Sequence, residues 1–233
     1  MRSNSEWFEE LRYHKGTSPE IRMKSYCYEM CANIVRSDGW ALHTIPYKYR
    51  TYEVCSLAIQ DDGLALSLVP GEIIDYEMCT RAVSKDGWSL WAVPRAFLTF
   101  EVCEIAVRNC GIALEAVPSE FKTYWLCFDA VRQNGLALYE VPLEFQTYSL
   151  RLTALKQNGL ALWAIPEGSR DPLLCLTAVE QNGLALWAVP ECMRNSHICE
   201  IAVRQSVLAI TPTPEHMRDE ILTIYTEINS PNI

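Results

Sequence analysis

The chain has 233 residues, a formal net charge of -9 and a hydrophobic fraction of 49%. This apolar content is enough for a buried core, which excludes a disordered chain. The acidic balance excludes phosphate-backbone recognition, so we expect no nucleic-acid partner. The longest apolar runs, such as LALWAVP, are too short for a membrane span. The N-terminus lacks the apolar segment of a secretory signal peptide, and we expect a cytoplasmic protein.

One phrase recurs at a fixed interval of 24 residues. It reads AVRQNGLALYEVP at 130–142, ALKQNGLALWAIP at 154–166 and AVEQNGLALWAVP at 178–190. Self-similarity at such a period is typical of repeat arrays, in which each unit buries its apolar face against the next. The sequence therefore predicts an all-α fold, an α-solenoid of about eight two-helix repeats over residues 28–216.

Residues 1–27 keep only fragments of the pattern, and we expect them to form an N-terminal cap. Within this segment Trp7, Phe8 and Leu11 are able to cover the apolar face of the first repeat. Solenoids require terminal units of this kind because an uncovered end would expose the core.

The first half of each repeat predicts an α-helix of about three turns. It starts at a residue whose side-chain oxygen can accept a free backbone N–H. This N-cap column comprises Thr51, Asp75, Thr99, Thr123, Thr147, Asp171, Asn195 and Asp219. Asn or Asp followed by glycine then ends the helix, which indicates a left-handed C-cap.

The second half, LALxxVP, fits either a short helix or a strand. A strand would give a leucine-rich-repeat horseshoe, whose repeats run about 20–29 residues. We favour a helix because the asparagine ladder of such repeats is missing, and because alanines such as Ala137 suit close helix–helix contact. The proline then ends this helix or opens a turn such as PLEF.

Residues 217–233 are expected to form a C-terminal capping helix. Asp219 stands at the N-cap position, and EILTIYTEI follows at 220–228. Because the units at both ends diverge from the repeat, we expect a complete array.

Seven of the ten cysteines stand on the 24-residue lattice, which skips only Arg151. A column of thiols indicates a packing position. Stacked helices lie about 8–10 Å apart, beyond the reach of a disulfide, so we expect all ten cysteines to be reduced. A zinc site at Cys27 and Cys31 would lack a second ligand pair, and we expect no metal and no cofactor. The lattice cysteines are Cys31, Cys55, Cys79, Cys103, Cys127, Cys175 and Cys199.

The chain carries no phosphate-binding loop, dinucleotide fingerprint, nucleophile elbow or HExxH string. The histidines, which are His14, His43, His197 and His216, share no motif. We therefore expect no enzyme. A cysteine-dependent enzyme is the weakest alternative, with Cys110 and Cys192 as the thiols to consider.

One column varies freely in character, four positions after each glycine. It reads His43, Ser67, Trp91, Glu115, Tyr139, Trp163, Trp187 and Thr211. Such mixed character indicates a position outside the packed core, and aromatic residues dominate binding hot spots. We therefore take Trp91, Tyr139, Trp163 and Trp187 as a partner-binding stripe. The alternative is that these rings only cover the grooves between repeats. Trp40 and Trp88, which replace the first leucine of LAL, are expected in the core.

The phrase AVxQNGLALxxVPxxF resembles a tandem helical repeat family of unknown function, whose consensus is roughly AVxQNGxALxxAxxxLxxDxxxxLxAAV. The resemblance covers residues 28–216 and is clearest at 130–145, 154–166 and 178–190. The chain departs from the family by a proline where serine is common, and by DG for NG in the first three repeats. The family is abundant in intracellular and amoeba-associated bacteria, and it has no established enzyme activity. The resemblance implies a helical array and suggests a bacterial effector or effector-accessory protein, translocated into a host cell.

Together these features predict a non-catalytic protein–protein interaction module, a scaffold or adaptor, that binds a protein partner through a solenoid face. The alternative is a self-associating structural repeat protein. We expect a monomer or a weak homodimer.

Overall fold

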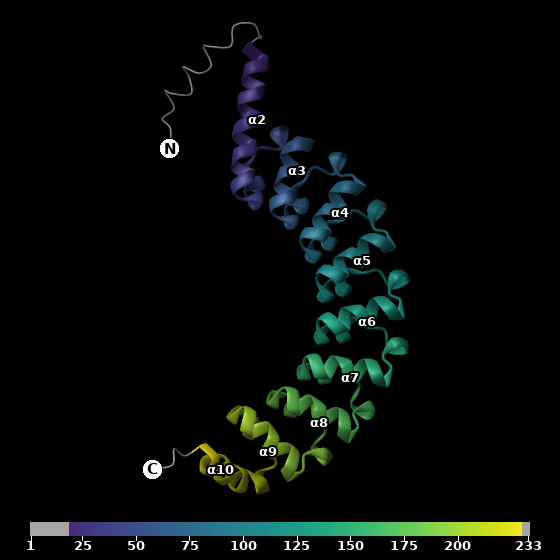
Figure 1. Ribbon diagram of the computed structural model, residues 1–233, viewed down its shortest axis with the longest axis vertical. Helices are drawn as coiled ribbons and strands as arrows, with labels where there is room; N and C mark the ends of the chain where they lie inside the picture. The colour runs from purple at the N-terminus through teal and green to yellow at the C-terminus, as the bar shows by residue number, and fades with distance from the viewer. Residues whose placement is uncertain (1–18, 230–233) are drawn as a thin grey trace. The chain divides into compact units, whose positions relative to one another are not determined.

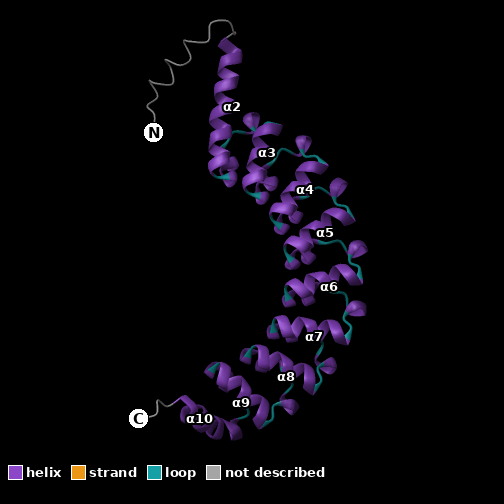
Figure 2. Ribbon diagram, viewed as in Figure 1, coloured by secondary structure: helices purple, strands orange, loops and turns teal. Residues whose placement is uncertain are grey.

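The structure of the chain, a computed structural model, describes residues 19–229. Within this range the regular elements are all helical, which confirms the predicted all-α repeat fold (Figure 2). The chain divides into two compact units at Leu98 and Thr99, and each is described by itself. The predicted cap residues Trp7, Phe8 and Leu11 lie outside the described residues.

The first unit builds its repeats from one α-helix and two 3₁₀ helices. Its α-helices are α2 (Pro19–Ser37), α3 (Tyr52–Asp61) and α4 (Tyr76–Lys85). Six-residue 3₁₀ helices follow as η1 (Gly39–Thr44), η3 (Gly63–Leu68) and η5 (Gly87–Ala92). Three-residue 3₁₀ helices complete the repeats as η2 (Tyr47–Tyr49), η4 (Gly71–Ile73) and η6 (Arg95–Phe97). Helix α2 runs across residues 27 and 28, where the sequence placed the boundary between cap and repeats.

The second unit continues the same pattern, with successive α-helices side by side in chain order (Figure 1). Its α-helices are α5 (Phe100–Asn109), α6 (Tyr124–Gln133), α7 (Tyr148–Gln157), α8 (Pro172–Gln181), α9 (Ser196–Gln205) and α10 (Glu215–Asn229). The longer 3₁₀ helices are η7 (Gly111–Ala116), η9 (Gly135–Glu140), η11 (Gly159–Ala164), η13 (Gly183–Ala188) and η15 (Val207–Ile210). The three-residue helices are η8 (Ser119–Phe121), η10 (Leu143–Phe145), η12 (Glu167–Ser169) and η14 (Glu191–Met193). The second helix that the sequence predicts in each repeat is thus a 3₁₀ helix, and the repeat proline precedes a further, three-residue 3₁₀ helix.

The predicted N-cap column is confirmed from α3 to α9 and fails at α10. At α6, for example, the Thr123 hydroxyl accepts the Leu126 N–H at 3.3 Å. Asp219, in contrast, lies inside α10, which begins at Glu215. In earlier repeats a short break separates the three-residue helix from the next α-helix, and a side chain from this break bonds to the following repeat. The Arg194 Nη1, for example, donates to the Pro212 carbonyl. In the last repeat a single helix, α10, takes the place of the three-residue helix and the α-helix.

The glycine after each α-helix is not a left-handed C-cap, as the sequence suggested. Asn134, which precedes Gly135, has an extended backbone (φ -143°, ψ 112°), and Gly135 itself is outside the left-handed region. The glycine is needed because the next repeat comes very close. A Cβ on Gly111 would lie 2.5 Å from the Ala130 carbonyl oxygen of the next α-helix, too close for any side chain. Where Asn or Asp precedes the glycine, as at Asn134, its side chain caps the 3₁₀ helix instead, whereas Cys110 before Gly111 makes no such bond.

The glutamine of the QNG motif ties one repeat to the next. The Gln157 Oε1 accepts the Gly135 N–H at 2.7 Å, and its amide donates to the Gln133 carbonyl at 3.0 Å. Gln181 makes the same pair of bonds to Gly159 and Gln157, at 2.5 and 3.3 Å. A carboxamide both donates and accepts, which suits this bridge. The three residues of the motif therefore have separate roles. The glutamine hydrogen-bonds to the neighbouring repeat, the asparagine caps the 3₁₀ helix, and the glycine leaves room for the next α-helix.

The lattice cysteines are buried, as predicted, and every cysteine in the described residues is free. The prediction that Trp40 and Trp88 lie in the core is wrong, because they are 45% and 39% exposed. A 3₁₀ helix has three residues per turn, so residues i and i+3 share a face. In η3, for example, Gly63 and Leu66 face the core while Leu64 faces solvent. The first leucine of LAL therefore belongs to the outer face of the helix.

The close approach at the repeat glycines gives a direct test. We expect Gly159→Ala to lower the free energy of unfolding by more than about 2 kcal/mol, because its Cβ would collide with the Ala178 carbonyl of the next α-helix. Gly168→Ala is the matched control, since a Cβ there meets no atom within 4 Å, and we expect a change within about 0.5 kcal/mol. Urea unfolding followed by circular dichroism measures both. Equal stability of the two variants would contradict the proposed role of the glycine.

Candidate functional site

Three aromatic side chains of the predicted stripe lie on neighbouring 3₁₀ helices of the second unit. Tyr139, Trp163 and Trp187 stand on η9, η11 and η13, and each of these helices contacts the next. Their side chains are 53%, 50% and 47% exposed. We call these three residues the aromatic row. Trp91 occupies the same position on η5 of the first unit and is 61% exposed.

The column to which these rings belong is exposed in every repeat, whatever residue it holds. The prediction that it lies outside the packed core is therefore confirmed. Because residues i and i+3 of a 3₁₀ helix share a face, the column three positions earlier lies beside it. Leu136, Leu160 and Leu184 in this second column are half-buried. The aromatic row is consequently flanked by leucines and presents a mainly apolar strip.

A basic side chain anchors the end of the 3₁₀ helix beneath Trp163. The Arg170 Nε donates to the Ile165 carbonyl at 2.8 Å, and its Nη1 donates to the Ala188 carbonyl of the next repeat at 2.6 Å. The guanidinium carbon lies 5.9 Å from the centre of the Trp163 ring, within cation–π range. A positive charge at the carbonyl end of a helix is also favoured by the helix dipole. Arg170 therefore fixes both the helix and the ring.

The same anchor recurs four residues after the repeat proline, a column that the sequence reasoning missed. Its members that bond to backbone carbonyls are Arg50, Lys122, Gln146, Arg170, Arg194 and Arg218. Gln146, below Tyr139, is buried and donates to the Leu138 and Val141 carbonyls at 3.3 and 3.0 Å. The signal was visible as basic residues at the 24-residue interval. The role of these residues was not visible, because their carbonyl partners belong partly to the next repeat.

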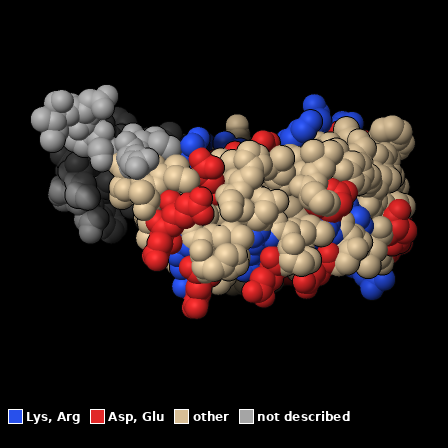
Figure 3. Space-filling view, turned by 90° about the horizontal axis from the view of Figure 1, so that it is seen from below, with Lys and Arg blue, Asp and Glu red and all other residues tan. Residues whose placement is uncertain are grey.

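The rings of the row have no charge near neutral pH. Burial raises the pKa of Tyr139, and the positive charge of Arg170 only partly opposes this, so the phenol stays protonated. Trp187 also forms one wall of an open cavity of about 850 Å³ between η13, η14 and the start of α10. Cys192, Met217 and Arg218 line this cavity as well. On the face shown in Figure 3, uncharged residues separate small groups of acidic and basic side chains. The row is suited to apolar contact and not to acid–base chemistry.

The groups considered for catalysis do not converge in the described residues. His197 and His216 are exposed, and the His43 Nδ1 lies 2.8 Å from the Trp40 carbonyl, while His14 lies outside the described range. Cys110 is half-buried and Cys192 exposed. No group of three or more His, Cys, Asp or Glu side chains that could hold a metal is found among residues 19–229. In the same range no helix is both long and apolar enough to cross a bilayer.

Comparison of the chain with known protein families, with curated proteins and with solved structures found no match. The resemblance to the helical repeat family of unknown function stays a prediction. The function must therefore be argued from the arrangement of this chain's own residues.

The anchor beneath Trp163 can be tested by removing its charge. Arg170→Met keeps the apolar stem but leaves two carbonyls without their donor, and we expect it to lower the free energy of unfolding by about 1–3 kcal/mol. Arg132→Met is the control, because that side chain is 71% exposed and its ion pair with Asp129 is long, at 3.9 Å. We expect the control to change stability by less than about 0.5 kcal/mol. Equal effects in urea unfolding would show that the anchor contributes nothing specific.

Thiol labelling at pH 8 tests the burial of the lattice cysteines. Burial raises the pKa of Cys55, Cys79, Cys103, Cys127 and Cys175 to about 11, so at pH 8 only about one molecule in a thousand carries each as the reactive thiolate. We expect one fast-reacting thiol, Cys192, which Cys192→Ser removes. The lattice thiols should react only on unfolding. A fast lattice thiol in the native protein would contradict the burial of this column.

Proposed function

We propose that this protein is a non-catalytic protein-recognition module, a scaffold or adaptor, that binds a protein partner through the aromatic row. One observation carries the proposal: three adjacent repeats present an aromatic ring, about half exposed, at the same position. Tryptophan and tyrosine are the residues most enriched at binding hot spots. Contiguous apolar surface is also uncommon on proteins that bind nothing.

The scaffold under the row supports this function because it is already ordered. Asn158 caps the start of η11 through its bond to the Leu160 N–H at 3.0 Å, and Arg170 anchors its end. The ring of Trp163 consequently has little freedom to lose on binding, and such preorganisation favours affinity. Neighbouring repeats follow one another at about 9–10 Å. A partner must therefore offer apolar groups about three residues apart on an extended segment, or about two turns apart on a helix.

Self-association is the second candidate function. The same row on two copies of the chain could pair around a twofold axis, because the apolar strip is complementary to itself. The family resemblance supports a protein of an intracellular bacterium. This protein would bind its partner either in the bacterial cytoplasm or, as a translocated effector, in a host cell, and the same surface would serve in both places.

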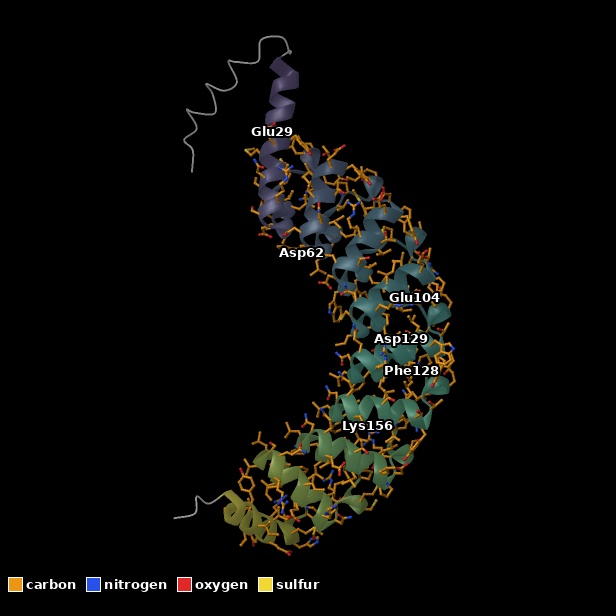
Figure 4. The ribbon with its side chains drawn as sticks, viewed as in Figure 1. Glu29, Asp62, Glu104, Phe128, Asp129 and Lys156 are labelled. Carbon is orange, nitrogen blue, oxygen red and sulfur yellow. The ribbon has the colours of Figure 1, made fainter. Side chains whose placement is uncertain are left out.

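A photo-reactive phenylalanine analogue placed at position 163 or 187 of the full chain tests the proposal in cells. We expect discrete cross-links to a second protein from either position, and none from the analogue at Lys156, an exposed residue near the C-terminal end of α7 (Figure 4). Cross-linking only to a second copy of the chain would favour self-association instead. The absence of any cross-link from both row positions would contradict the proposal.

The partner found in this way gives the quantitative test. We expect the double variant Trp163→Ala, Trp187→Ala to weaken its binding at least about 100-fold, as for two hot-spot tryptophans, with the melting temperature nearly unchanged because both rings are half exposed. Trp40→Ala, which removes an exposed tryptophan that belongs to neither candidate surface, is the control. Calorimetry and thermal melts measure both. A large loss of stability in the double variant would show that the rings serve packing.

A further inference from the structure

Helix α6 breaks the repeat pattern at a position where earlier repeats carry glutamate. Trp125 is 73% exposed, more than any other large apolar side chain among the described residues. Earlier repeats place an acid here, at Glu29, Glu53, Glu77 and Glu101. A tryptophan this exposed adds little to the buried core, and most of its surface is open to a ligand.

Three rings on α6 form one cluster, which we call the α6 cluster: Tyr124, Trp125 and Phe128. The Trp125 ring stands edge-on to Tyr124 and to Phe128, with centroids 5.3 and 6.3 Å away. Tyr124 and Phe128 are stacked with their centroids 6.3 Å apart. These contacts orient Trp125 before any ligand arrives and leave most of its surface to solvent.

The repeat next to the α6 cluster places acids in register with the rings. Glu101 and Glu104 occupy on α5 the positions that Trp125 and Phe128 occupy on α6, and the two helices pack against each other. Glu104 on α5, with Phe128 and Asp129 on α6, is labelled in Figure 4. Because repeats are spaced at about 9–10 Å, an acidic pair lies directly beside an aromatic pair.

Two further acids on the three-residue helices approach the same helix ends. Burial and, as a smaller cause, the Glu120 carboxylate raise the pKa of Cys103 to about 11, which indicates that Glu120 lies near α5. Burial also raises the pKa of Cys127; the Lys122 charge lowers it and the Glu144 carboxylate, a smaller cause, raises it, which indicates that Glu144 lies near α6. Within the described residues neither Glu120 nor Glu144 has an ion-pair partner. Both carboxylates are therefore open to a cation from a partner.

Two basic residues near this edge, Lys122 and Arg108, already have partners within the chain. The Lys122 Nζ is turned to the Glu140 carbonyl at 2.9 Å and lies 3.7 Å from the Glu140 carboxylate. Arg108 pairs with Glu104 at 2.9 Å on the surface of α5. Such an exposed pair is weak, so an incoming cation can replace Arg108.

We propose that the α6 cluster and the acids beside it bind an arginine-bearing segment of a basic protein partner. The planar guanidinium stacks on an aromatic face such as that of Trp125, and its forked N–H groups donate to a carboxylate beside it. Lysine offers a point charge without the flat face and is the poorer ligand. This proposal does not depend on the aromatic row, which lies on other helices.

Peptide binding to the full chain tests the proposal. The probe is a fluorescein-labelled peptide of four Arg-Gly units, compared with its lysine and citrulline counterparts by fluorescence anisotropy. We expect the arginine peptide to bind at least about 5-fold more tightly than the lysine peptide, and the citrulline peptide not to bind. Trp125→Ala should weaken the arginine peptide about 10-fold or more, while Trp125→Phe keeps part of the affinity. Glu120→Gln with Glu144→Gln should weaken it about 3-fold and flatten its salt dependence.

Trp40→Ala is the matched control, and we expect it to bind the arginine peptide within about twofold of the native chain, because this exposed tryptophan belongs to neither the α6 cluster nor the aromatic row. Native binding by Trp125→Ala, or equal binding of the arginine and lysine peptides, would overturn the proposal. Either result would assign the interaction to the overall charge of -9. Because Trp125 is exposed, we expect its substitution to leave the melting temperature nearly unchanged, which a thermal melt measures.

Discussion

The structure depends on one close contact, in which a repeat glycine lies against the carbonyl of an alanine in the next α-helix. At Gly135 the neighbour is Ala154, and no side chain fits between the two backbones. This contact sets the distance between repeats. The Gln157 carboxamide stabilises it with two hydrogen bonds, one to the Gly135 N–H and one to the Gln133 carbonyl. Without the glycine, the glutamine could not reach both partners, and the repeats would not pack at this spacing.

The 3₁₀ form of the second helix decides which residues meet solvent. With three residues per turn, its buried face repeats at Gly159 and Leu162, and its outer face at Leu160 and Trp163. The outer face of the 3₁₀ helix comprises two columns of residues, whereas the inner face is packed against neighbouring repeats and does not accommodate larger side chains. Variation between repeats is therefore confined to outward positions. Trp163 and Trp125 both stand at exposed positions, one in a repeated series and one in a column that holds glutamate in the earlier repeats.

The two candidate surfaces differ in their chemistry. The row is uncharged and extends over three repeats, anchored from below by Arg170 and its equivalents. The α6 cluster is compact and has Glu101 and Glu104 in register beside it. The row would select a partner by the spacing of the partner's apolar groups, whereas the α6 cluster would select a ligand by its guanidinium group. A scaffold with both surfaces could hold two different segments, because neither shares a residue with the other.

The sequence by itself determined the repeat, its period, its helical class, its N-caps such as Thr123 and the buried column that contains Cys127, because these depend on local propensity and on spacing along the chain. It also placed Tyr139, Trp163 and Trp187 outside the core, since their column tolerates charge. The exposure of Trp88, the purpose of the glycine and the bonds of Arg170 were decided only by the tertiary structure. Each depends on the 3₁₀ turn or on the next repeat. A contact between repeats places side by side residues that the chain separates by about one full period, and no local pattern records which atoms then meet.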